Sequence, residues 1–430
     1  MNDYATFLAS KKRVFLGEGL EAEALPSALF PWQQAIVRWA LRKGRAAVWA
    51  DCGLGKTPMQ LAWAHASGRR ALILAPLCVA EQTVREGAKF GIPVVYAPDM
   101  HAVGSAPIVV TNYERLDKFD VSAFGAVVLD ESSILKAFDG KTRTKLIATF
   151  KDTPFRLCCT ATPAPNDIAE LANHAEFLGL MTRAEFLATW FVHDDDGWRM
   201  KRHAVEPFYR WLASWAVAIR RPSDLGYDDA GFNLPPLRII DHVVESDTPS
   251  GSLFPELSVK GIGGRLAARR DSLDARCTAV ENIVDEWGSS WLVWCGLNDE
   301  SATLAKNLSG AVEVTGSDAY AEKVGAVVGF CDGRIKTLVS KVRILGYGLN
   351  FQHCSRMVFV GLGDSYEQYY QAIRRCWRFG QKRPVEAHIV VSEAEQVIVE
   401  NVRKKEATAD QLSQSLIGQM LDFEREELIA

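Results

Sequence analysis

The sequence contains no hydrophobic run long enough to cross a bilayer. Its longest nearly apolar stretch, residues 71–80, is interrupted by Pro76 and falls well short of the roughly 20 residues that a membrane-spanning helix needs. The first residues also lack the basic segment, apolar stretch and small-residue cleavage site of a secretory signal. We therefore expect a cytoplasmic protein that makes no use of a membrane.

Cysteine occurs in a pattern that argues against a disulfide framework. The count is nine, an odd number, and no two cysteines have the Cys-x-x-Cys spacing. Most lie in apolar company, as Cys158, Cys159, Cys295 and Cys331 do. We therefore expect neither a disulfide scaffold nor a structural zinc site.

An excess of positive charge is also missing. The chain has 49 Lys and Arg against 53 Asp and Glu, a formal net charge of −4. Any binding of nucleic acid must therefore be local, through a groove with its own positive field. Small basic clusters occur, among them residues 374–383, but each cluster taken alone is better explained as solvated surface charge.

What the sequence does contain is a repeated alternation of short apolar runs and helical stretches. At roughly 150 residues a domain, the 430 residues are enough for two to three domains. The alternation predicts an α/β fold class, with two tandem domains that each have a parallel sheet flanked by helices. The apolar runs begin at Ala46, Ala71, Ile108, Ala126 and Arg156 in the first half, and at Trp291, Val312, Ile335, Met357 and His388 in the second.

Residues 166–235 between the two halves have a different pattern. Phe208, Trp211, Leu212 and Trp215 have the spacing of one apolar helix face, and we expect them to be core residues of a helical insertion in the first domain. Residues 246–264 are rich in Ser, Pro and Gly, which suits a linker. The predicted organisation is a first domain at 1–240, a linker at 241–265, and a second domain at 266–430 that ends in a helix.

The strongest chemical signal is the segment DCGLGKT, residues 51–57. It follows an apolar run and precedes a helical stretch, which is the context of a phosphate-binding loop. Gly53 and Gly55 permit backbone angles at which amide groups face phosphate oxygens. Lys56 would bind the β and γ phosphates, and Thr57 would offer its hydroxyl to magnesium. The pattern departs from the general one at Ala50, where a glycine is usual, and a chance match is the alternative.

A second signal is VVLDESS, residues 127–133, an apolar strand that ends in two carboxylates. The C-terminal end of such a strand lies at the ligand crevice of an α/β sheet. Asp130 would hold magnesium, and Glu131 would polarise the water that attacks the γ-phosphate. An isolated Asp-Glu pair is more often a helix cap, but together with the phosphate loop the catalytic interpretation is favoured.

A third signal lies in the second half, in QAIRRCWRFGQKR, residues 371–383. Arg375 and Arg378 are three residues apart and would share one face of a helix. An arginine that reaches the γ-phosphate stabilises the transition state of hydrolysis. A basic helix face on the surface is the alternative.

Taken in order, these segments resemble the Swi/Snf-type motors of helicase superfamily two over nearly the whole chain. Further segments carry the same resemblance: LFPWQQ from Leu29, LILAPLCVAEQ from Leu72, VVTNYERL from Val109, LCCTATPAPND from Leu157, WLVWCGLNDE from Trp291, VTGSDAY from Val314 and ILGYGLNFQHC from Ile344. The compact form looks most like motors encoded by bacteriophages and other mobile elements. Ser132 and Ser133 stand where relatives commonly have Ala and His, and Cys376 and Trp377 where they have Ala and His.

The resemblance implies two RecA-like lobes that bind ATP and Mg²⁺ between them, with double-stranded DNA as the partner and the chain acting as a monomer. By this resemblance Gln33 would read adenine, Gly348 would belong to the nucleotide site, and Arg375 and Arg378 would be arginine fingers. It implies contacts to the DNA backbone, largely independent of sequence, by Thr111, Asn112, Thr160, Ser317 and Asn350. Read singly, these five are as well explained as turn or cap residues. Lys341, which stands where relatives often have a small polar residue, is a further candidate contact to DNA.

Three functions remain open from the sequence. The first is a translocase that moves along double-stranded DNA without parting the strands, which the resemblance implies. The second is a strand-separating helicase on DNA or RNA, for which 430 residues leave little room beyond two lobes and the insertion. The third is a binding module gated by nucleotide, which Glu131 and the two arginines argue against.

Overall fold

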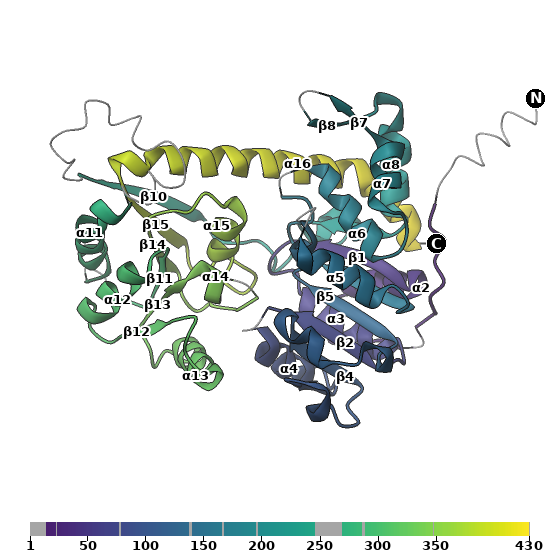
Figure 1. Cartoon of the computed structure of the whole chain (residues 1–430), viewed down its shortest axis with the longest axis horizontal. Coiled ribbons are helices and arrows are strands. Elements are labelled where there is room, and N and C mark those ends of the chain that lie inside the picture. The colour runs from purple at the N-terminus through teal and green to yellow at the C-terminus, as the bar shows by residue number, and fades with distance from the viewer. Residues whose placement is uncertain are drawn as a thin grey trace, which may run out of the picture. The chain divides into compact units, whose positions relative to one another are not determined.

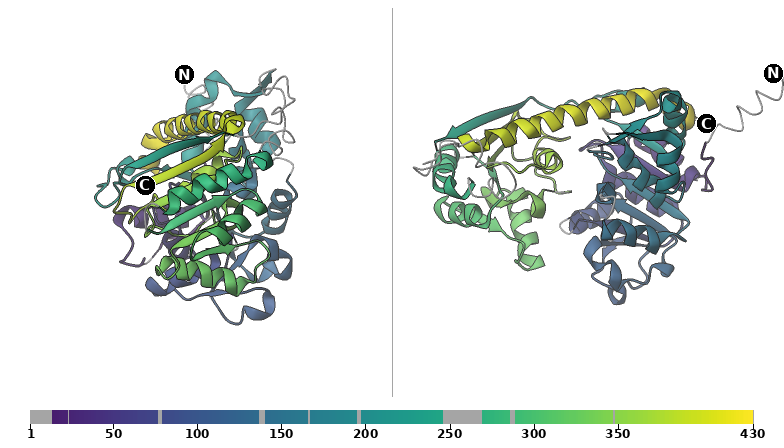
Figure 2. Two further views of the ribbon diagram at one scale, coloured as in Figure 1. Left: turned by 90° about the vertical axis from the view of Figure 1, so that its left-hand side faces the viewer. Right: turned by 45° about the horizontal axis from the view of Figure 1, so that its top comes forward.

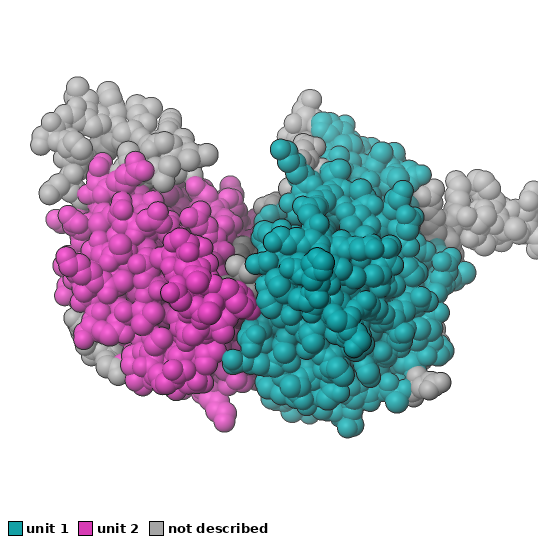
Figure 3. Space-filling view, turned by 60° about the horizontal axis from the view of Figure 1, so that its bottom comes forward, with its two compact units in different colours: residues 1–232, 409–430 teal, residues 233–408 magenta. Residues whose placement is uncertain are grey.

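The computed structural model of the chain describes residues 14–22, 24–76, 79–136, 140–165, 167–194, 197–245, 269–285, 289–346 and 348–429. It divides the chain into two compact units (Figure 3). The first unit comprises residues 1–232 and 409–430, and the second comprises residues 233–408. Among the described residues, no helix is both long enough and apolar enough to pass through a bilayer.

The first unit has a seven-stranded sheet in the order β3-β4-β2-β5-β6-β1-β9, in which every pair of neighbours is parallel. Its strands β2 and β5 are buried at every position, as expected for a parallel sheet that is covered on both faces. The strands are β1 (Arg45–Ala50), β2 (Ala71–Ala75), β3 (Val94–Tyr96), β4 (Ile108–Asn112), β5 (Ala126–Asp130), β6 (Phe155–Cys159) and β9 (Ala216–Ile219).

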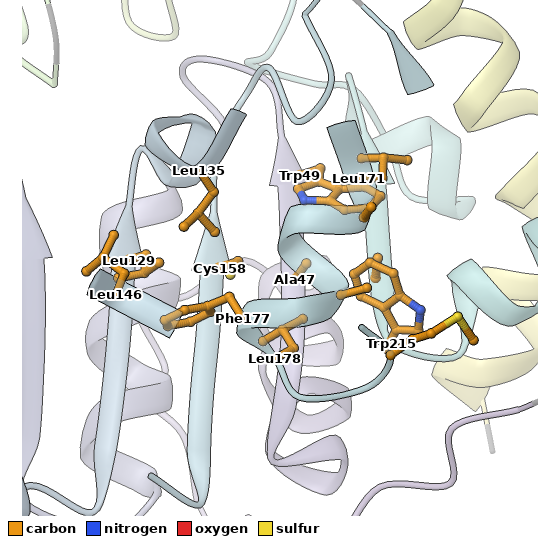
Figure 4. Packing of buried hydrophobic residues seen from close by; sticks show 14 of the residues in the cluster. Ala47, Trp49, Leu129, Leu135, Leu146, Cys158, Leu171, Phe177, Leu178 and Trp215 are labelled. Carbon is orange, nitrogen blue, oxygen red and sulfur yellow. The ribbon is translucent and has the colours of Figure 1, made fainter. Parts of the chain in front are cut away.

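Helices cover both faces of this sheet, and each face has its own apolar core. Along β1, Ala47 and Trp49 enter one core while Ala46 and Val48 enter the other, because successive side chains of a strand point to opposite faces. Figure 4 shows part of the core that contains Trp49. The helices are α2 (Pro31–Lys43), α3 (Lys56–Ala66), α4 (Ala80–Lys89), α5 (Lys141–Phe150), α6 (Leu171–Phe177), α7 (Arg183–Trp190) and α8 (Val205–Ala213).

The segment predicted as a helical insertion is only partly helical. It contains α6, α7 and α8, and Phe208, Trp211, Leu212 and Trp215 are all core residues as expected. However, α8 ends before Trp215, and the next residues form β9, which pairs with β1 in the main sheet. Strands β7 (Phe191–Asp194) and β8 (Gly197–Met200) form an antiparallel hairpin in the same segment. The predicted single apolar helix face is therefore wrong at Trp215, where pairing with the sheet replaces the helix.

The second unit has a six-stranded sheet in the order β10-β15-β14-β11-β13-β12, again entirely parallel. In Figure 1, α11 and α12 lie on one side of this sheet and α14 and α15 on the other, and Figure 2 gives two further views. The fold class expected from the sequence, α/β with two tandem domains that each have a parallel sheet flanked by helices, is confirmed. The strands are β10 (Leu237–Val244), β11 (Trp291–Cys295), β12 (Ala311–Val314), β13 (Thr337–Lys341), β14 (Arg356–Val360) and β15 (Val385–Ser392).

The helices of the second unit are α11 (Leu273–Asp285), α12 (Asn298–Asn307), α13 (Tyr320–Cys331), α14 (Val342–Leu345) and α15 (Tyr366–Ile373), followed by the first part of α16 (Gln396–Ile429). The division of the chain differs from the predicted one at two points. Strand β10 pairs with β15, so residues 237–244 belong to the second sheet and not to the first domain and linker. Residues 409–430 belong to the first unit. The remainder of the predicted linker, from residue 246, lies outside the described residues.

A buried cluster of ion pairs links several elements of the second unit. Glu300, at the start of α12, accepts hydrogen bonds from Arg269 at 2.8 Å and from Arg276 at 2.7 Å. Arg276 also lies 3.3 Å from a carboxylate oxygen of Glu395. Burial alone would raise the pKa of Glu300, but the two guanidinium groups outweigh it and hold that pKa below its ordinary value. Glu300 therefore stays charged at neutral pH.

Candidate active site

The segment predicted as a phosphate loop has the required local structure. It runs from the end of β1 to the first residue of α3, Lys56. Gly53 and Gly55 have φ angles of 94° and 72°, in the left-handed region that glycine adopts without steric penalty. The Lys56 ammonium donates to the carbonyl oxygen of Ala50 at 2.9 Å. The loop therefore presents an ammonium group and the N-terminus of an eleven-residue helix, both of which favour a bound phosphate.

Gln33, predicted to contact adenine, lies against this loop. Its side-chain amide donates to the carbonyl oxygen of Leu54 at 3.0 Å, and its own oxygen accepts from the backbone N–H of Phe30. A Cβ atom at Gly55 would lie only 2.4 Å from the Gln33 amide nitrogen. The glycine is therefore needed both for its backbone angle and for this close approach.

The two carboxylates lie at the end of β5, as predicted. Asp130 and Glu131 are 5% and 7% exposed. The side chain of Gln60 donates to Asp130 at 2.7 Å and so connects the phosphate-loop helix α3 to the carboxylate. The sequence reasoning missed Gln60, although its position four residues after Lys56 places it on the same face of the helix.

Two further side chains, which directly follow strands β4 and β6, donate hydrogen bonds to Asp130 and Glu131. The Tyr113 hydroxyl donates to the backbone oxygen of Asp130 at 2.7 Å. Burial, with Asp130 adding to it, raises the pKa of Tyr113 well above its ordinary value, so its phenol stays protonated as a donor. Thr160, at the end of β6, donates to Glu131 at 3.4 Å and accepts from the backbone N–H of Thr162. Thr160 thus connects the segment LCCTATPAPND to the carboxylate pair.

The donor atoms near the phosphate loop suit magnesium. Mg²⁺ prefers oxygen ligands, and it is commonly bound by one or two carboxylates together with waters and substrate phosphates. Thr57, in the first turn of α3, and Asp130 supply a hydroxyl and a carboxylate of this kind. Within the described residues, no group of three or more His, Cys, Asp or Glu side chains could hold a metal on its own. The residues present therefore fit a metal that is held jointly with a nucleotide.

In the second unit, the two predicted arginine fingers differ in their surroundings. Arg375 is 2% exposed and donates to the backbone oxygen of Gln371 at 2.8 Å, to the Gln371 side-chain oxygen at 2.7 Å and to the backbone oxygen of Leu349 at 2.9 Å. Arg378 is half-buried and donates to the same Leu349 oxygen at 2.9 Å. All of these acceptors belong to the second unit. In this structure the hydrogen bonds of Arg375 therefore stabilise the second unit. Gly348 directly precedes Leu349, whose carbonyl oxygen accepts from both arginines.

The candidates for nucleic-acid contacts fall into two groups. Thr111, Asn112 and Thr160 are buried in the first unit, where a phosphate of a nucleic acid does not reach their side chains. In the second unit, Ser317 is exposed, Asn350 is half-buried, and Lys341 is buried and hydrogen-bonded to Asn298. Burial, followed by the repulsion of Arg343, lowers the pKa of Lys341.

Lys341 lines a cavity in the second unit together with Arg269 and Arg343. The cavity has a volume of about 280 Å³. It lies at the carboxyl ends of β11, β13 and β14, the edge at which parallel sheets bind ligands. Arg269 is paired with Glu300, so Lys341 and Arg343 supply the positive charge that favours an anionic ligand at this edge.

Comparison with known proteins identifies part of the second unit. Residues 278–380 match the family described as the helicase conserved C-terminal domain. This range covers the segments WLVWCGLNDE, VTGSDAY and ILGYGLNFQHC and extends into the arginine segment. The resemblance to helicases drawn from these segments is therefore confirmed in the second unit.

Two similar proteins extend over most of the chain. A putative protein p41 of Acyrthosiphon pisum secondary endosymbiont phage 1 is 24% identical over 479 aligned residues, which cover 90% of this chain and 98% of the relative. Among solved structures, the Sulfolobus solfataricus SWI2/SNF2 ATPase core in complex with double-stranded DNA matches with a TM-score of 0.44 and 19% identity. That match covers 96% of this chain and 98% of the other.

Proposed function

Because its second unit contains a helicase conserved C-terminal domain, we propose that this chain is a Swi/Snf-type motor of helicase superfamily two. The motor hydrolyses ATP and uses the energy to move along double-stranded DNA. The observation that carries the proposal is the arrangement in the first unit. There, a phosphate loop with two left-handed glycines and a buried carboxylate pair are joined by the hydrogen bond from Gln60 to Asp130.

In this proposal the residues of the first unit bind ATP and activate water. Lys56 and the N-terminus of α3 bind the phosphates, Gln33 contacts the adenine, and Thr57 and Asp130 hold Mg²⁺, which neutralises charge on the phosphates when it is bound. Glu131 polarises the attacking water. The nearly complete burial of Glu131 supports this role. A carboxylate that is shielded from bulk solvent can bind and orient a single water molecule.

The second unit completes the reaction and contacts DNA in this proposal. Arg378 stabilises the charge that develops on the γ-phosphate, and Arg375 either joins it after leaving its present acceptors or holds the segment that carries it. The cavity lined by Arg269, Lys341 and Arg343 supports binding of the DNA backbone. The similarity to a phage protein supports work in the cytoplasm of a bacterial host cell.

ATP hydrolysis measured with duplex DNA, single-stranded DNA and RNA tests the proposed activity. We expect duplex DNA to stimulate hydrolysis most, and the stimulation to fall steeply with salt, because the contacts are to phosphates. The matched control is Lys56→Ala, which removes the phosphate-binding ammonium. If none of the three nucleic acids raises the rate of the wild-type protein, the motor is excluded and a binding module gated by nucleotide takes its place.

A pair of displacement assays separates translocation from strand separation. A translocase on duplex DNA displaces the third strand of a triplex and leaves the duplex intact. We expect ATP-dependent triplex displacement by the wild-type protein, and none by Lys56→Ala. Unwinding of a forked duplex without triplex displacement would instead identify a strand-separating helicase.

A further inference from the structure

Glu131 has a strained backbone. Its φ angle of 55° makes it, within the described ranges, the only residue other than glycine with a positive φ. For a residue with a side chain, this conformation is sterically disfavoured. It persists only where the surrounding structure holds it, and such residues cluster at functional sites. The contacts that hold the chain next to Glu131 therefore bear on where its carboxylate lies.

Helix α6 supplies those contacts on the C-terminal side of Glu131. The chain after Glu131 forms a 3-10 turn, Ser132–Lys136. Two consecutive residues of α6 hold this turn at both ends. His174 shares a hydrogen bond with the Ser132 hydroxyl through Nε2 at 3.0 Å, and the Asn173 amide donates to the carbonyl oxygen of Leu135 at 2.8 Å.

We call these two contacts, His174 with Ser132 and Asn173 with Leu135, the clamp. The three side chains that make it are buried in the first unit. Ser132 and Asn173 are 0% exposed and His174 is 1% exposed. In such surroundings a hydrogen bond does not compete with water, so removal of one partner leaves the other buried and unsatisfied. The bond between Ser132 and His174 is therefore a firm restraint on the residue that directly follows Glu131.

On its other side, the His174 ring contacts the strand that leads into the phosphate loop. The edge of the ring lies against Trp49, with 5.8 Å between ring centroids and 62° between ring planes. Trp49 precedes Ala50, whose carbonyl oxygen accepts the Lys56 ammonium. His174 thus packs between the strand that ends at the phosphate loop and the turn that begins after Glu131.

The His174 ring is neutral under ordinary conditions. Burial lowers the pKa of His174 to about 4. Its second nitrogen, Nδ1, has no hydrogen-bond partner among the described residues. The ring therefore takes no part in moving protons at neutral pH, and its contribution is geometric.

We propose that His174 is a positioning residue for Glu131, and that its hydrogen bond to Ser132 maintains the strained backbone on which the Glu131 carboxylate is carried. This inference rests on the proposed function, in which Glu131 orients the attacking water. In the segment VVLDESS, this chain has Ser132 and Ser133 where Swi/Snf-type relatives commonly have Ala and His. Here a histidine of helix α6, His174, contacts the turn that follows the carboxylate pair.

The test compares His174→Leu, His174→Gln and Ser132→Ala in steady-state ATP hydrolysis by the full chain with duplex DNA. We expect His174→Leu to lower kcat by about tenfold or more, since small misplacements of a reacting group reduce rates by up to about 10²-fold. The KM for ATP should stay within about twofold, because the substitution changes no residue of the phosphate loop. His174→Gln, whose amide can reach the Ser132 hydroxyl, should recover most of the activity. The double variant of His174→Leu with Ser132→Ala should be no worse than His174→Leu alone.

A matched control separates positioning from general stability. Phe177→Leu alters the same helix and the same core but keeps the hydrogen bonds that Asn173 and His174 make to the turn, and it should lower Tm while leaving kcat unchanged. If His174→Leu lowers activity only in proportion to the folded fraction, as Phe177→Leu would, the proposal is overturned.

A second measurement does not depend on activity. In hydrogen–deuterium exchange, His174→Leu should speed exchange of the amides at residues 131–136, with little change in helix α3. Unchanged exchange in that segment would also overturn the proposal. A wild-type protein that hydrolyses no ATP, but whose turn loosens in His174→Leu, would instead contradict the proposed function and leave the clamp standing.

Discussion

Replacement of the two arginines of the second unit one at a time gives a sharp test of their roles. The Arg375 guanidinium makes three hydrogen bonds to Gln371 and Leu349 and is 2% exposed. A hydrogen bond from a charged donor contributes about 1.5–3 kcal/mol. Because two of the three end on the same residue and are not independent, we expect Arg375→Ala to lower the free energy of unfolding by about 3–5 kcal/mol. That is a large share of the roughly 5–15 kcal/mol that stabilises a domain.

Arg378→Ala should behave differently. The side chain is half-buried and shares the Leu349 carbonyl oxygen that Arg375 also reaches, so that oxygen keeps a donor after truncation. We expect a loss of only about 1 kcal/mol of stability. In the proposed motor, however, Arg378→Ala removes the charge that faces the γ-phosphate. It should lower kcat by about 10³-fold with near-normal nucleotide affinity.

The assay pairs urea unfolding, followed by tryptophan fluorescence, with ATP hydrolysis and nucleotide binding for the same preparations. Arg375→Lys serves as the control that keeps the positive charge but not the planar set of donors. Suppose Arg375→Ala unfolds at the wild-type urea concentration and nevertheless hydrolyses no ATP. The role of Arg375 would then not be to stabilise the second unit, and its guanidinium would have to act on the nucleotide directly.

Three further predictions follow from the contacts of the two units. Glu131→Gln should bind ATP as the wild type does but hydrolyse it at least about 10²-fold more slowly, and wild-type turnover in a single-turnover assay would remove Glu131 from its role. Glu300→Gln should cost about 3–5 kcal/mol in urea unfolding because it removes the buried carboxylate that Arg269 and Arg276 both contact. Folding lowers the pKa of Glu300, so the Glu300 carboxylate stabilises the fold above the ordinary pKa of glutamate, and this stabilisation is lost as the pH falls through the lowered pKa. If the difference in unfolding free energy between wild type and Glu300→Gln stayed constant down to strongly acidic pH, this reasoning would be contradicted. Gly55→Ala should cost about 1–2 kcal/mol from its backbone angle and displace Gln33, so that equilibrium titration shows weaker ATP binding, whereas unchanged affinity would show that the loop tolerates the clash.

The strands of the two sheets were largely predictable because buried parallel strands have continuous apolar sequences. Strands β2 and β5 coincide with the runs that begin at Ala71 and Ala126. Strand β9 was missed because AVAI is a short apolar run whose periodicity does not distinguish helix from strand. Strand β10 contains charged as well as apolar residues, so its sequence is not a continuous apolar run. It lies at the edge of its sheet and pairs with a single neighbouring strand.

The candidate site was predictable where local sequence determines local geometry. The backbone angles of the phosphate-loop glycines and the position of the carboxylates at the end of β5 depend mainly on the residues next to them in the sequence. The burial of Arg375 could not be predicted, because arginine is seldom buried and its acceptor on Leu349 lies 26 residues away. The contact of His174 with Ser132 joins positions 42 residues apart and depends on how α6 packs in the tertiary fold.

Helix α16 has a consequence for how the first unit acquires its structure. Leu416 and Met420 belong to the core that contains Trp49, and the Glu424 carboxylate accepts a hydrogen bond from the backbone N–H of Ala218 on the edge strand β9. A ribosome translates these residues only after the entire second unit has been made. Part of the core of the first unit therefore stays uncovered until a segment about 180 residues later has been made. Nascent chains stalled before residue 409 should be unusually sensitive to proteases.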